Sequence, residues 1–341
     1  MDLVCPHCRS NLKVSVDFLQ CLECDKSWSI VKGVPQFVRQ AEYWGEVGLT
    51  QELARDIVKK MEHQGWKQVI RDHPSPTVRG YLEWLTDLNR AHWHALANLK
   101  SDSVVLDLGA GLGTISYVLS RSYAHVFAVE KVEERVEFMR LRFAQDGCDN
   151  ITLIRTDIDL LPFPEQSLDL IVLNGVLEWL PYNRKDLNPR EAQLHYLTKL
   201  RTLLKPGGTL YVGIENRLSY KFFAGAPDPH IWIKFVPVLP RIVSDAVCKL
   251  KIGDRYRPYT YSHLGYRKLL AQAGFREVEM LTVFPSYHDP KEIISLNSKS
   301  ELFVKNTWMT KNPLSAAVKR IMTELDLLKY FSHNYILFAR N

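Results

Sequence analysis

Apolar residues along the middle of the chain follow two repeating patterns. Short apolar runs predict buried strands, and runs with apolar residues at three- and four-residue spacing predict helices. Strands are expected at residues 104–108, 125–130, 151–155, 168–173 and 209–215, and helices at 114–121, 133–145 and 189–204. Repeated strand–helix units of this length predict an α/β fold, a doubly wound Rossmann-like sheet with helices on both faces. Ligands of such sheets bind at the carboxyl ends of the strands.

The region before this core has helical periodicity. Residues 51–64 and 78–99 carry apolar residues at helical spacing, and Pro74 and Pro76 separate the two runs. We therefore expect a helical linker, or a lid over the ligand, at residues 41–100.

The region after the core is expected to complete it. Residues 101–216 form the predicted ligand-binding core, and a substrate cap insertion is expected at 217–262. Residues 276–284 and 334–340 have the composition of strands, so 263–341 should complete the sheet and carry an inserted helical segment.

The first predicted strand leads into a glycine-rich loop. The sequence VLDLGAGLGT contains Gly109, Ala110, Gly111 and Gly113. A dinucleotide loop has the spacing G-x-G-x-x-G, whose third glycine lets the helix pack against the strand. Thr114 occupies that position here. The glycines alone leave two ligands open, a dinucleotide or S-adenosylmethionine.

Polar residues stand at the ends of successive strands. Asp107 precedes the glycine loop, Glu130 ends the second strand, Asp157 follows the third and Asn174 follows the fourth. A carboxylate at the second strand can accept both ribose hydroxyls. Asp157 can accept from the adenine amino group while the backbone amide of Ile158 donates to the ring. One adenosyl ligand is thus expected to contact all of these strand ends, and a helix cap at Asp157 or a turn at Asn174 is the alternative.

This set of residues resembles the motifs of class I S-adenosylmethionine-dependent methyltransferases. The matching segments are LDLGAGLGT, AVEKVEER, TDIDLLPFPEQSLDLIVLNGVLEWL and LLKPGGTLYVGIEN. The resemblance implies that S-adenosylmethionine is the cofactor, with the glycine loop against its methionine moiety. It also implies that Glu130 holds the ribose and that Asp157 and Ile158 lie at the adenine.

Four cysteines near the N-terminus form two C-x2-C pairs, Cys5 with Cys8 and Cys21 with Cys24. Two such pairs can place four thiolates at the corners of a tetrahedron, the geometry that zinc prefers. Because the protein fills all four positions, the zinc is expected to be structural. This zinc ribbon, residues 1–40, resembles ribbons ahead of some bacterial methyltransferases and zinc-ribbon proteins that partner tRNA methyltransferases.

Composition and charge narrow the class of protein. An apolar fraction of 46% and a charged fraction of 24% are typical of globular proteins. The N-terminus lacks the pattern of a signal peptide, so a cytoplasmic location is expected. Residues 217–341 carry 19 Lys and Arg against 10 Asp and Glu, whereas 1–216 carry 25 against 28. The last third therefore favours an anionic partner or is simply a solvated basic surface.

The segment after the last core strand carries the candidate acceptor site. The sequences GIENR and KFFAGAPDPH resemble methyltransferases encoded with bacterial surface-glycan and natural-product pathways. On this resemblance Glu215, Asn216 and Arg217 line the acceptor side. His230 or Asp228 is the candidate base, since an imidazole titrates near neutral pH. A loop histidine bonded to the backbone is the alternative for His230.

Residues 231–251 mix apolar and basic side chains. Ile242, Val243, Ala246, Val247 and Leu250 are predicted to share one face of a short helix. We expect that face to pack on the sheet as a cap. The alternative is an interfacial helix that touches a membrane-bound, lipid-linked acceptor.

The predicted function is O-methylation of a saccharide-like or other small acceptor, which could be anionic or lipid-linked. Residues 174–177 read NGVL rather than the Asn/Asp-Pro-Pro-aromatic motif of enzymes that methylate exocyclic amines. Two alternatives stay open: an rRNA or tRNA methyltransferase, and a non-catalytic scaffold that binds S-adenosylmethionine and recruits a partner enzyme.

Overall fold

The computed structural model describes residues 3–38, 42–43, 48–296, 317, 320–322 and 324–341 of the chain. The chain forms two compact units. The first comprises Met1–Val172 and Thr202–Gly208, and the second comprises Leu173–Arg201 and Thr209–Asn341. The helical segment expected within the C-terminal region falls mainly on residues 297–316, outside the described residues.

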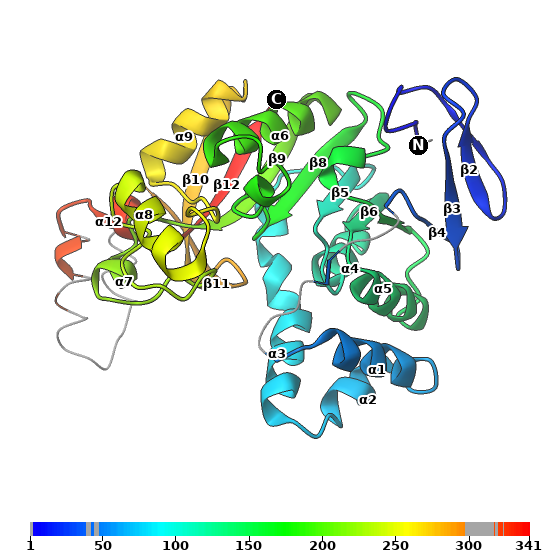
Figure 1. The fold of residues 1–341 in the computed structure, drawn as a ribbon, viewed down its shortest axis with the longest axis horizontal. Helices are drawn as coiled ribbons and strands as arrows, with labels where there is room; N and C mark the ends of the chain where they lie inside the picture. Colours follow the sequence, from blue (N-terminus) through cyan, green and yellow to red (C-terminus); the bar gives the residue numbers. More distant parts are fainter. Residues whose placement is uncertain (1–2, 39–41, 44–47, 297–316, 318–319, 323) are drawn as a thin grey trace. The chain divides into compact units, whose positions relative to one another are not determined.

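The first unit begins with a small antiparallel sheet, shown in blue in Figure 1. Its strands are β1 (Leu12–Val14), β2 (Phe18–Cys21), β3 (Ser27–Val31) and β4 (Val34–Pro35). The backbone of Gln36 forms a parallel bridge with Arg155, and the Phe37 amide donates to the Arg155 carbonyl at 2.9 Å. Val34 packs in one buried cluster with Ala128 and Met139. The small sheet is therefore joined to the edge of the Rossmann-like core.

Helices follow at α1 (Gln51–Met61), α2 (Trp66–Arg71) and α3 (Pro76–Thr86), with a 3-10 helix at Leu88–Leu96. The expected helix over 78–99 is divided at Asp87, whose backbone is extended and whose side chain accepts from the Asn89 amide. This N-cap starts a new helical segment, because a capping side chain satisfies amides that the first turn leaves free. The short helix α2 was not expected.

The alternating strands and helices lie close to their predicted positions. The first unit contains β5 (Val104–Leu108), α4 (Thr114–Ser120), β6 (His125–Glu130), α5 (Glu133–Gln145), β7 (Ile151–Arg155), a 3-10 helix (Ile158–Leu160) and most of β8 (Leu168–Asn174). Strand β5 pairs in parallel with β6 and β8, and β6 pairs with β7. Nearly every residue of β5 and β6 is buried, as in parallel strands covered on both faces.

The second unit completes the sheet with antiparallel strands. Its elements are a 3-10 helix (Leu180–Tyr182), most of α6 (Pro189–Leu203) and β9 (Leu204–Glu215), α7 (Tyr220–Phe223), α8 (Arg241–Ile252), α9 (His263–Gln272), β10 (Glu277–Ser286), β11 (Asp289–Ser295), α12 (Leu328–Phe331) and β12 (Asn334–Arg340). The strand order of the mixed sheet is β11-β10-β12-β9-β8-β5-β6-β7. The predicted Rossmann-like fold is confirmed, including the two strands near 276–284 and 334–340.

Helix α8 differs from the expectation that its apolar face packs as a cap. Its buried residues are Ser244 and Cys248, whereas Ile242 and Leu250 are 86% and 88% exposed. The Ser244 hydroxyl donates to the Val236 carbonyl at 2.8 Å, which turns this polar face inward. The apolar stripe therefore faces solvent. Among the described residues, none of the helices has both the length and the apolar composition needed to cross a bilayer.

Candidate functional site

The glycine loop connects β5 to α4 in the first unit. Gly111 has a φ of +58°, a left-handed conformation that favours glycine. A Cβ built on Gly111 would meet no heavy atom within 4 Å, so space is open beside the loop. The amides of Gly109 and Ala110 donate to the Val129 carbonyl at 2.8 and 2.9 Å. The loop is thus fixed against the end of β6, next to open space for a ligand.

Glu130 ends β6 with its carboxylate turned toward the glycine loop. One oxygen accepts from the amides of Lys131 and Val132 at 2.8 and 3.0 Å, and the other accepts from the Gly111 amide at 3.2 Å. A carboxylate offers about four lone-pair positions. The three amides leave about one position for a ribose hydroxyl, and the Arg135 guanidinium lies 3.7 Å from Oε2. Ribose binding at Glu130 stays a prediction.

The other predicted cofactor residues lie at further strand ends. Asp107 is buried and accepts from the Ser116 hydroxyl at 2.6 Å, and burial raises its pKa to about 6. Asp157 follows β7, where the Lys131 ammonium lies 3.4 Å from its carboxylate, and the adjoining Ile158 is buried. In the second unit, Asn174 accepts from the Tyr211 hydroxyl at 3.2 Å. Contact of these residues with the cofactor stays a prediction.

Sequence reasoning missed the residue that supports the glycine loop from behind. Arg142 of α5 is fully buried and donates to the Leu112 carbonyl at 2.9 Å and to the Thr114 hydroxyl at 2.8 Å. Its guanidinium also lies over the rings of Trp66 and Tyr117. An arginine within a helical pattern reads as a solvated position, so the sequence carried no signal for this role.

The four N-terminal cysteines converge in the first unit. The Sγ atoms of Cys5 and Cys24 are 3.6 Å apart, and those of Cys8 and Cys21 are 3.3 Å apart. All four sulfurs lie within 4.8 Å of one another. Four thiolates at these separations fit the tetrahedral sulfur shell of a zinc ion.

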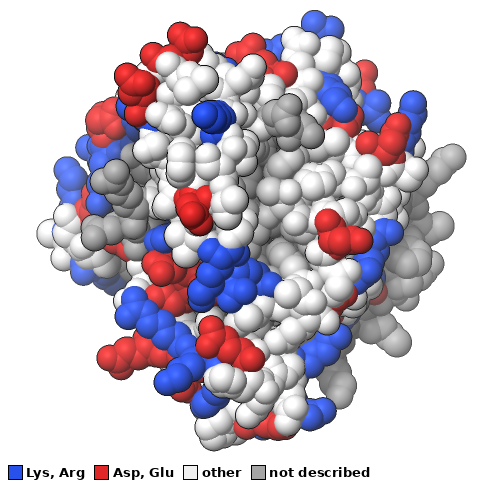
Figure 2. Space-filling view, turned by 90° about the vertical axis from the view of Figure 1, so that its right-hand side faces the viewer, with Lys and Arg blue, Asp and Glu red and all other residues white. Residues whose placement is uncertain are grey.

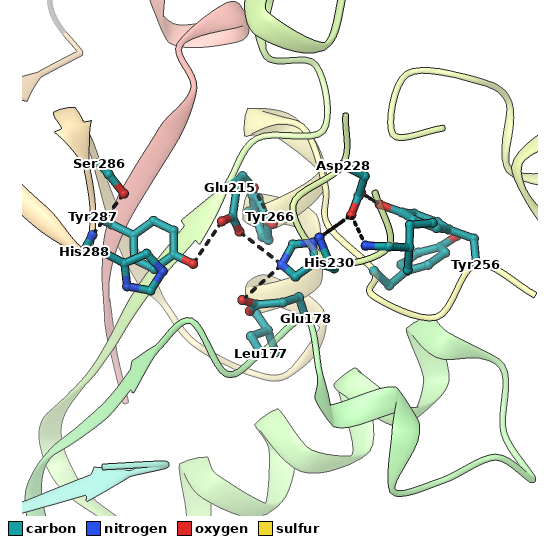
Figure 3. Close-up of polar contacts among 12 residues, drawn as sticks. Leu177, Glu178, Glu215, Asp228, His230, Tyr256, Tyr266, Ser286, Tyr287 and His288 are labelled. Carbon is teal, nitrogen blue, oxygen red and sulfur yellow. Dashed lines mark hydrogen bonds and ion pairs between the residues drawn. The ribbon is translucent and has the colours of Figure 1, made fainter. Parts of the chain in front are cut away.

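The second unit gathers a buried acid–base cluster around His230 (Figure 3). Its Nδ1 lies 3.1 Å from Asp228 Oδ1, and its Nε2 lies 3.6 Å from Glu178 Oε1 and 3.7 Å from Glu215 Oε2. Asp228 is fixed by the Tyr256 hydroxyl, which donates at 2.6 Å. Asp228 therefore orients the ring so that Nε2 points between the two glutamates.

The two glutamates follow the ends of strands. Glu178 comes shortly after β8, and Glu215 is the last residue of β9. The Tyr287 hydroxyl donates to Glu215 Oε1 at 3.0 Å. The Oε2 atom of each glutamate is buried and has no hydrogen-bond partner among the described residues. Glu178 Oε2 is thus available for a donor group, whereas Glu215 Oε2 lies 3.7 Å from His230 Nε2.

The residues of the cluster shift one another's pKa values. Burial alone would lower the pKa of His230, but the hydrogen bond to Asp228 and the nearby carboxylates of Glu178 and Glu215 hold that pKa well above 6.5. Burial raises the pKa of Glu215 to about 7, the charge of His230 opposes this shift, and the charge of Glu178 adds to it. The carboxylates thus stabilise an imidazolium at His230.

This arrangement allows two kinds of chemistry. An imidazole oriented by a carboxylate can remove a proton from a hydroxyl, because the surrounding charges stabilise the imidazolium that forms. Alternatively, the ligand atoms of Glu178, Glu215 and His230 lie within 4.8 Å of one another, a spacing that one metal ion could bridge.

Two predicted acceptor residues have other partners. Asn216 is fully buried, donates to the carbonyls of Tyr330 and Ser332 at 2.8 Å each, and accepts from the Leu218 amide. Arg217 donates to the carbonyls of Pro237 and Leu239 at 2.9 and 2.7 Å.

These bonds give Asn216 and Arg217 structural contacts, and their place on the acceptor side stays a prediction. Both side chains donate to backbone carbonyls of other segments of the chain. Of the three residues expected on the acceptor side, Glu215 alone belongs to the cluster.

Sequence reasoning placed His230, Asp228 and Glu215 near the acceptor but missed Glu178, Tyr256 and Tyr287. Glu178 lies in the apolar segment NGVLEWL, where a single acidic residue in a buried run was an available signal. The two tyrosines lie far along the chain, and only the folded backbone brings them to the cluster.

Comparisons with known proteins find similarity to methyltransferases. Residues 99–228 match the family described as "Methyltransferase domain". The chain is 35% identical over 108 residues to demethylmenaquinone methyltransferase of Clavibacter sepedonicus, which covers 32% of this chain and 39% of that protein. It is 31% identical over 137 residues to ubiquinone biosynthesis O-methyltransferase of Xylella fastidiosa (strain M23), covering 40% and 52%.

The chain spans about half or less of the length of these curated relatives. A solved S-adenosylmethionine-dependent methyltransferase from Aquifex aeolicus aligns with a TM-score of 0.42 and 15% identity, over 80% of this chain and 96% of that one. Residues 99–228 are thus similar to a methyltransferase domain, and the sheet to which they contribute has a Rossmann-like fold.

Proposed function

We propose that this protein is an S-adenosylmethionine-dependent methyltransferase that transfers a methyl group to an oxygen of a small acceptor. The observation that carries the proposal is the oriented cluster of His230, Asp228, Glu178 and Glu215. Its two glutamates lie at or shortly after the ends of strands β9 and β8. The names of both curated relatives support methyl transfer, and one names an oxygen acceptor.

In the proposed reaction, a hydroxyl oxygen of the acceptor attacks the methyl carbon of the sulfonium. The carbon–sulfur bond breaks, its electron pair stays on sulfur, and S-adenosylhomocysteine leaves. The hydroxyl proton passes to Nε2 of His230, while Asp228 holds the ring and the glutamates stabilise the imidazolium. A sulfonium is already a good leaving group, so alignment and proton removal are the protein's main tasks.

The cofactor is proposed to lie across the glycine loop, with its ribose at Glu130 and its adenine at Asp157 and Ile158. Asp107 and Asn174 are proposed to border it. Open space beside Gly111 and the loop-facing carboxylate of Glu130 support this placement. Arg142 and Ser116 would act indirectly, by holding the loop and Asp107.

A small saccharide-like acceptor fits the proposal because a buried carboxylate oxygen of the cluster without a partner can accept a hydrogen bond from a hydroxyl group. RNA is less well supported. Figure 2 shows acidic and basic side chains mixed over the face that it displays, among the described residues. An extended single-sign basic face is the usual footprint of nucleic-acid binding.

A radiolabelled methyl-transfer assay tests the acceptor. We expect label from S-adenosylmethionine to enter hydroxyl-bearing small molecules, such as saccharides or phenols, and mass spectrometry to identify a methyl ether. Label in amines alone would contradict oxygen transfer. Transfer to tRNA or rRNA that falls steeply with salt would favour the RNA alternative instead. Donor binding without transfer to any acceptor would favour the scaffold.

We further propose that Cys5, Cys8, Cys21 and Cys24 hold one structural zinc. The sulfur separations support this assignment, and the ligand set leaves no position for a substrate. The ion would hold the ribbon whose Gln36 and Phe37 contact Arg155, at the strand end that precedes Asp157.

The double variant Cys8→Ser/Cys24→Ser tests the zinc. We expect it to lose the metal and to melt at least roughly 5 °C below the parent, since ribbon folding depends on its ion. Because the ribbon contacts the end of β7, donor affinity should also fall severalfold. Atomic emission and calorimetry measure both effects, with Cys148→Ser as the control. Full zinc content in the double variant would contradict the assignment.

A further inference from the structure

A short segment after His230 turns aromatic side chains outward. Ile233 and Val236 are buried in one cluster with Cys248 of α8. Between and beside them, Trp232 and Phe235 are exposed, Trp232 to 74%. Single exposed apolar side chains are common, but an exposed apolar patch indicates a contact surface.

The backbone holds these two aromatic residues in an uncommon conformation. Trp232 has a φ of +59° and Phe235 a φ of +65°, both in the left-handed region that bulky residues seldom adopt. The Trp232 amide nevertheless donates to the Asp228 carbonyl at 2.8 Å, and the Phe235 carbonyl accepts from Val238. The outward direction of both rings is therefore built into a hydrogen-bonded loop.

Helix α8 adds an apolar stripe to the same region. Ile242, Ala246 and Leu250 are exposed and follow one another at four-residue spacing, so they share one side of the helix. The opposite side, with Cys248, packs on Ile233 and Val236 of the aromatic segment. We call the outer residues of both elements the docking surface: Trp232, Phe235, Ile242, Val243, Ala246 and Leu250.

The charge around the docking surface is positive. Residues 231–252 contain four Lys and Arg but one acidic residue, Asp245. Lys234, Lys249 and Lys251 are exposed and form no ion pair among the described residues. The acidic Asp245 is instead engaged by the Tyr256 amide at 3.1 Å.

We propose that the docking surface binds the face of an anionic lipid bilayer. An exposed apolar stripe with lysines beside it and an exposed tryptophan are the features of an interfacial helix. The lysines complement anionic head groups, whereas a second copy would bring the same positive charges together. The surface begins two residues after His230, so a bilayer there would lie next to the acceptor segment. The proposal does not depend on the acceptor that is methylated.

Vesicle flotation with the full chain tests the proposal. We expect binding to vesicles of phosphatidylcholine with phosphatidylglycerol, and weaker binding to phosphatidylcholine alone. Ile242→Ser/Leu250→Ser should weaken binding at least about tenfold, because it removes the most exposed apolar side chains. Lys249→Glu/Lys251→Glu should weaken binding to anionic vesicles by roughly fivefold or more per residue and leave neutral vesicles unaffected.

Leu264→Ser is the matched control, since Leu264 of α9 is also an exposed leucine, at 63%, but lies outside the docking surface. It should bind like the parent, and all variants should keep the parent's melting temperature. Equal vesicle binding by the parent and by Ile242→Ser/Leu250→Ser would overturn the proposal, as would no binding by the parent. If the parent is a dimer that binds no vesicles, and Ile242→Ser/Leu250→Ser is a monomer, the docking surface would be assigned to a second copy instead.

Discussion

His230→Gln is expected to lower kcat/KM for methyl transfer by about 10²- to 10⁴-fold, the usual contribution of a general base. Glutamine can keep a hydrogen bond to Asp228 but cannot accept the acceptor's proton. Donor affinity, measured by calorimetry, should stay unchanged because His230 is not among the residues proposed to hold the cofactor. Equal losses of donor affinity and rate would indicate a structural role for His230.

The pH profile separates a base from a positioning residue. The neutral imidazole is the active form, so kcat/KM should fall as pH drops through the raised pKa of His230, which lies well above 6.5. Removing a neighbouring negative charge with Glu215→Gln should lower that pKa and shift the rising limb toward lower pH. If the rise of kcat/KM with pH occurs at the same pH in Glu215→Gln as in the parent, the proposed proton transfer would be contradicted.

Two controls belong to this experiment. His195→Gln alters an exposed histidine of α6 and should leave rate and pH profile unchanged. Chelation with EDTA tests whether Glu178, Glu215 and His230 hold a cation instead. Activity that disappears on chelation and returns with a divalent ion would reject His230 as the base.

Gly111→Arg is expected to abolish detectable binding of S-adenosylmethionine. The arginine side chain would enter the open space beside the loop, where the donor is proposed to lie. Calorimetry on the folded variant measures the effect. Binding that matches the parent would place the donor elsewhere.

Gly147→Arg is the matched control for this change. Gly147 also has a positive φ, +64°, and a Cβ there would meet no heavy atom within 4 Å. The two substitutions therefore carry a similar backbone cost. A difference in donor affinity between Gly111→Arg and Gly147→Arg would therefore come from the position of Gly111 in the glycine loop.

The sequence was sufficient to predict the core strands because parallel strands covered on both faces are continuous apolar runs. Strand β6 and helix α5 lie at their predicted bounds, 125–130 and 133–145. The helix expected at 78–99 instead divides at Asp87, where a capping side chain outweighs the apolar periodicity.

The candidate acceptor site was only partly predictable. His230 and Asp228 are near neighbours in sequence, so their pairing could be anticipated, whereas Glu178 and Tyr287 reach them through the fold. The apolar residues of α8 were predicted to share one face, but that face was expected to pack on the sheet and instead faces solvent. The burial of Ser244 depends on its bond to the Val236 carbonyl, which apolar patterning does not reveal.

The most direct test of the account is a crystal structure of the protein with S-adenosylhomocysteine. We predict adenosyl density along the glycine loop, with ribose hydroxyls on the Glu130 carboxylate and the adenine at Asp157. A ligand bound away from Glu130, or a crystal that takes up a nicotinamide dinucleotide there instead, would contradict the account.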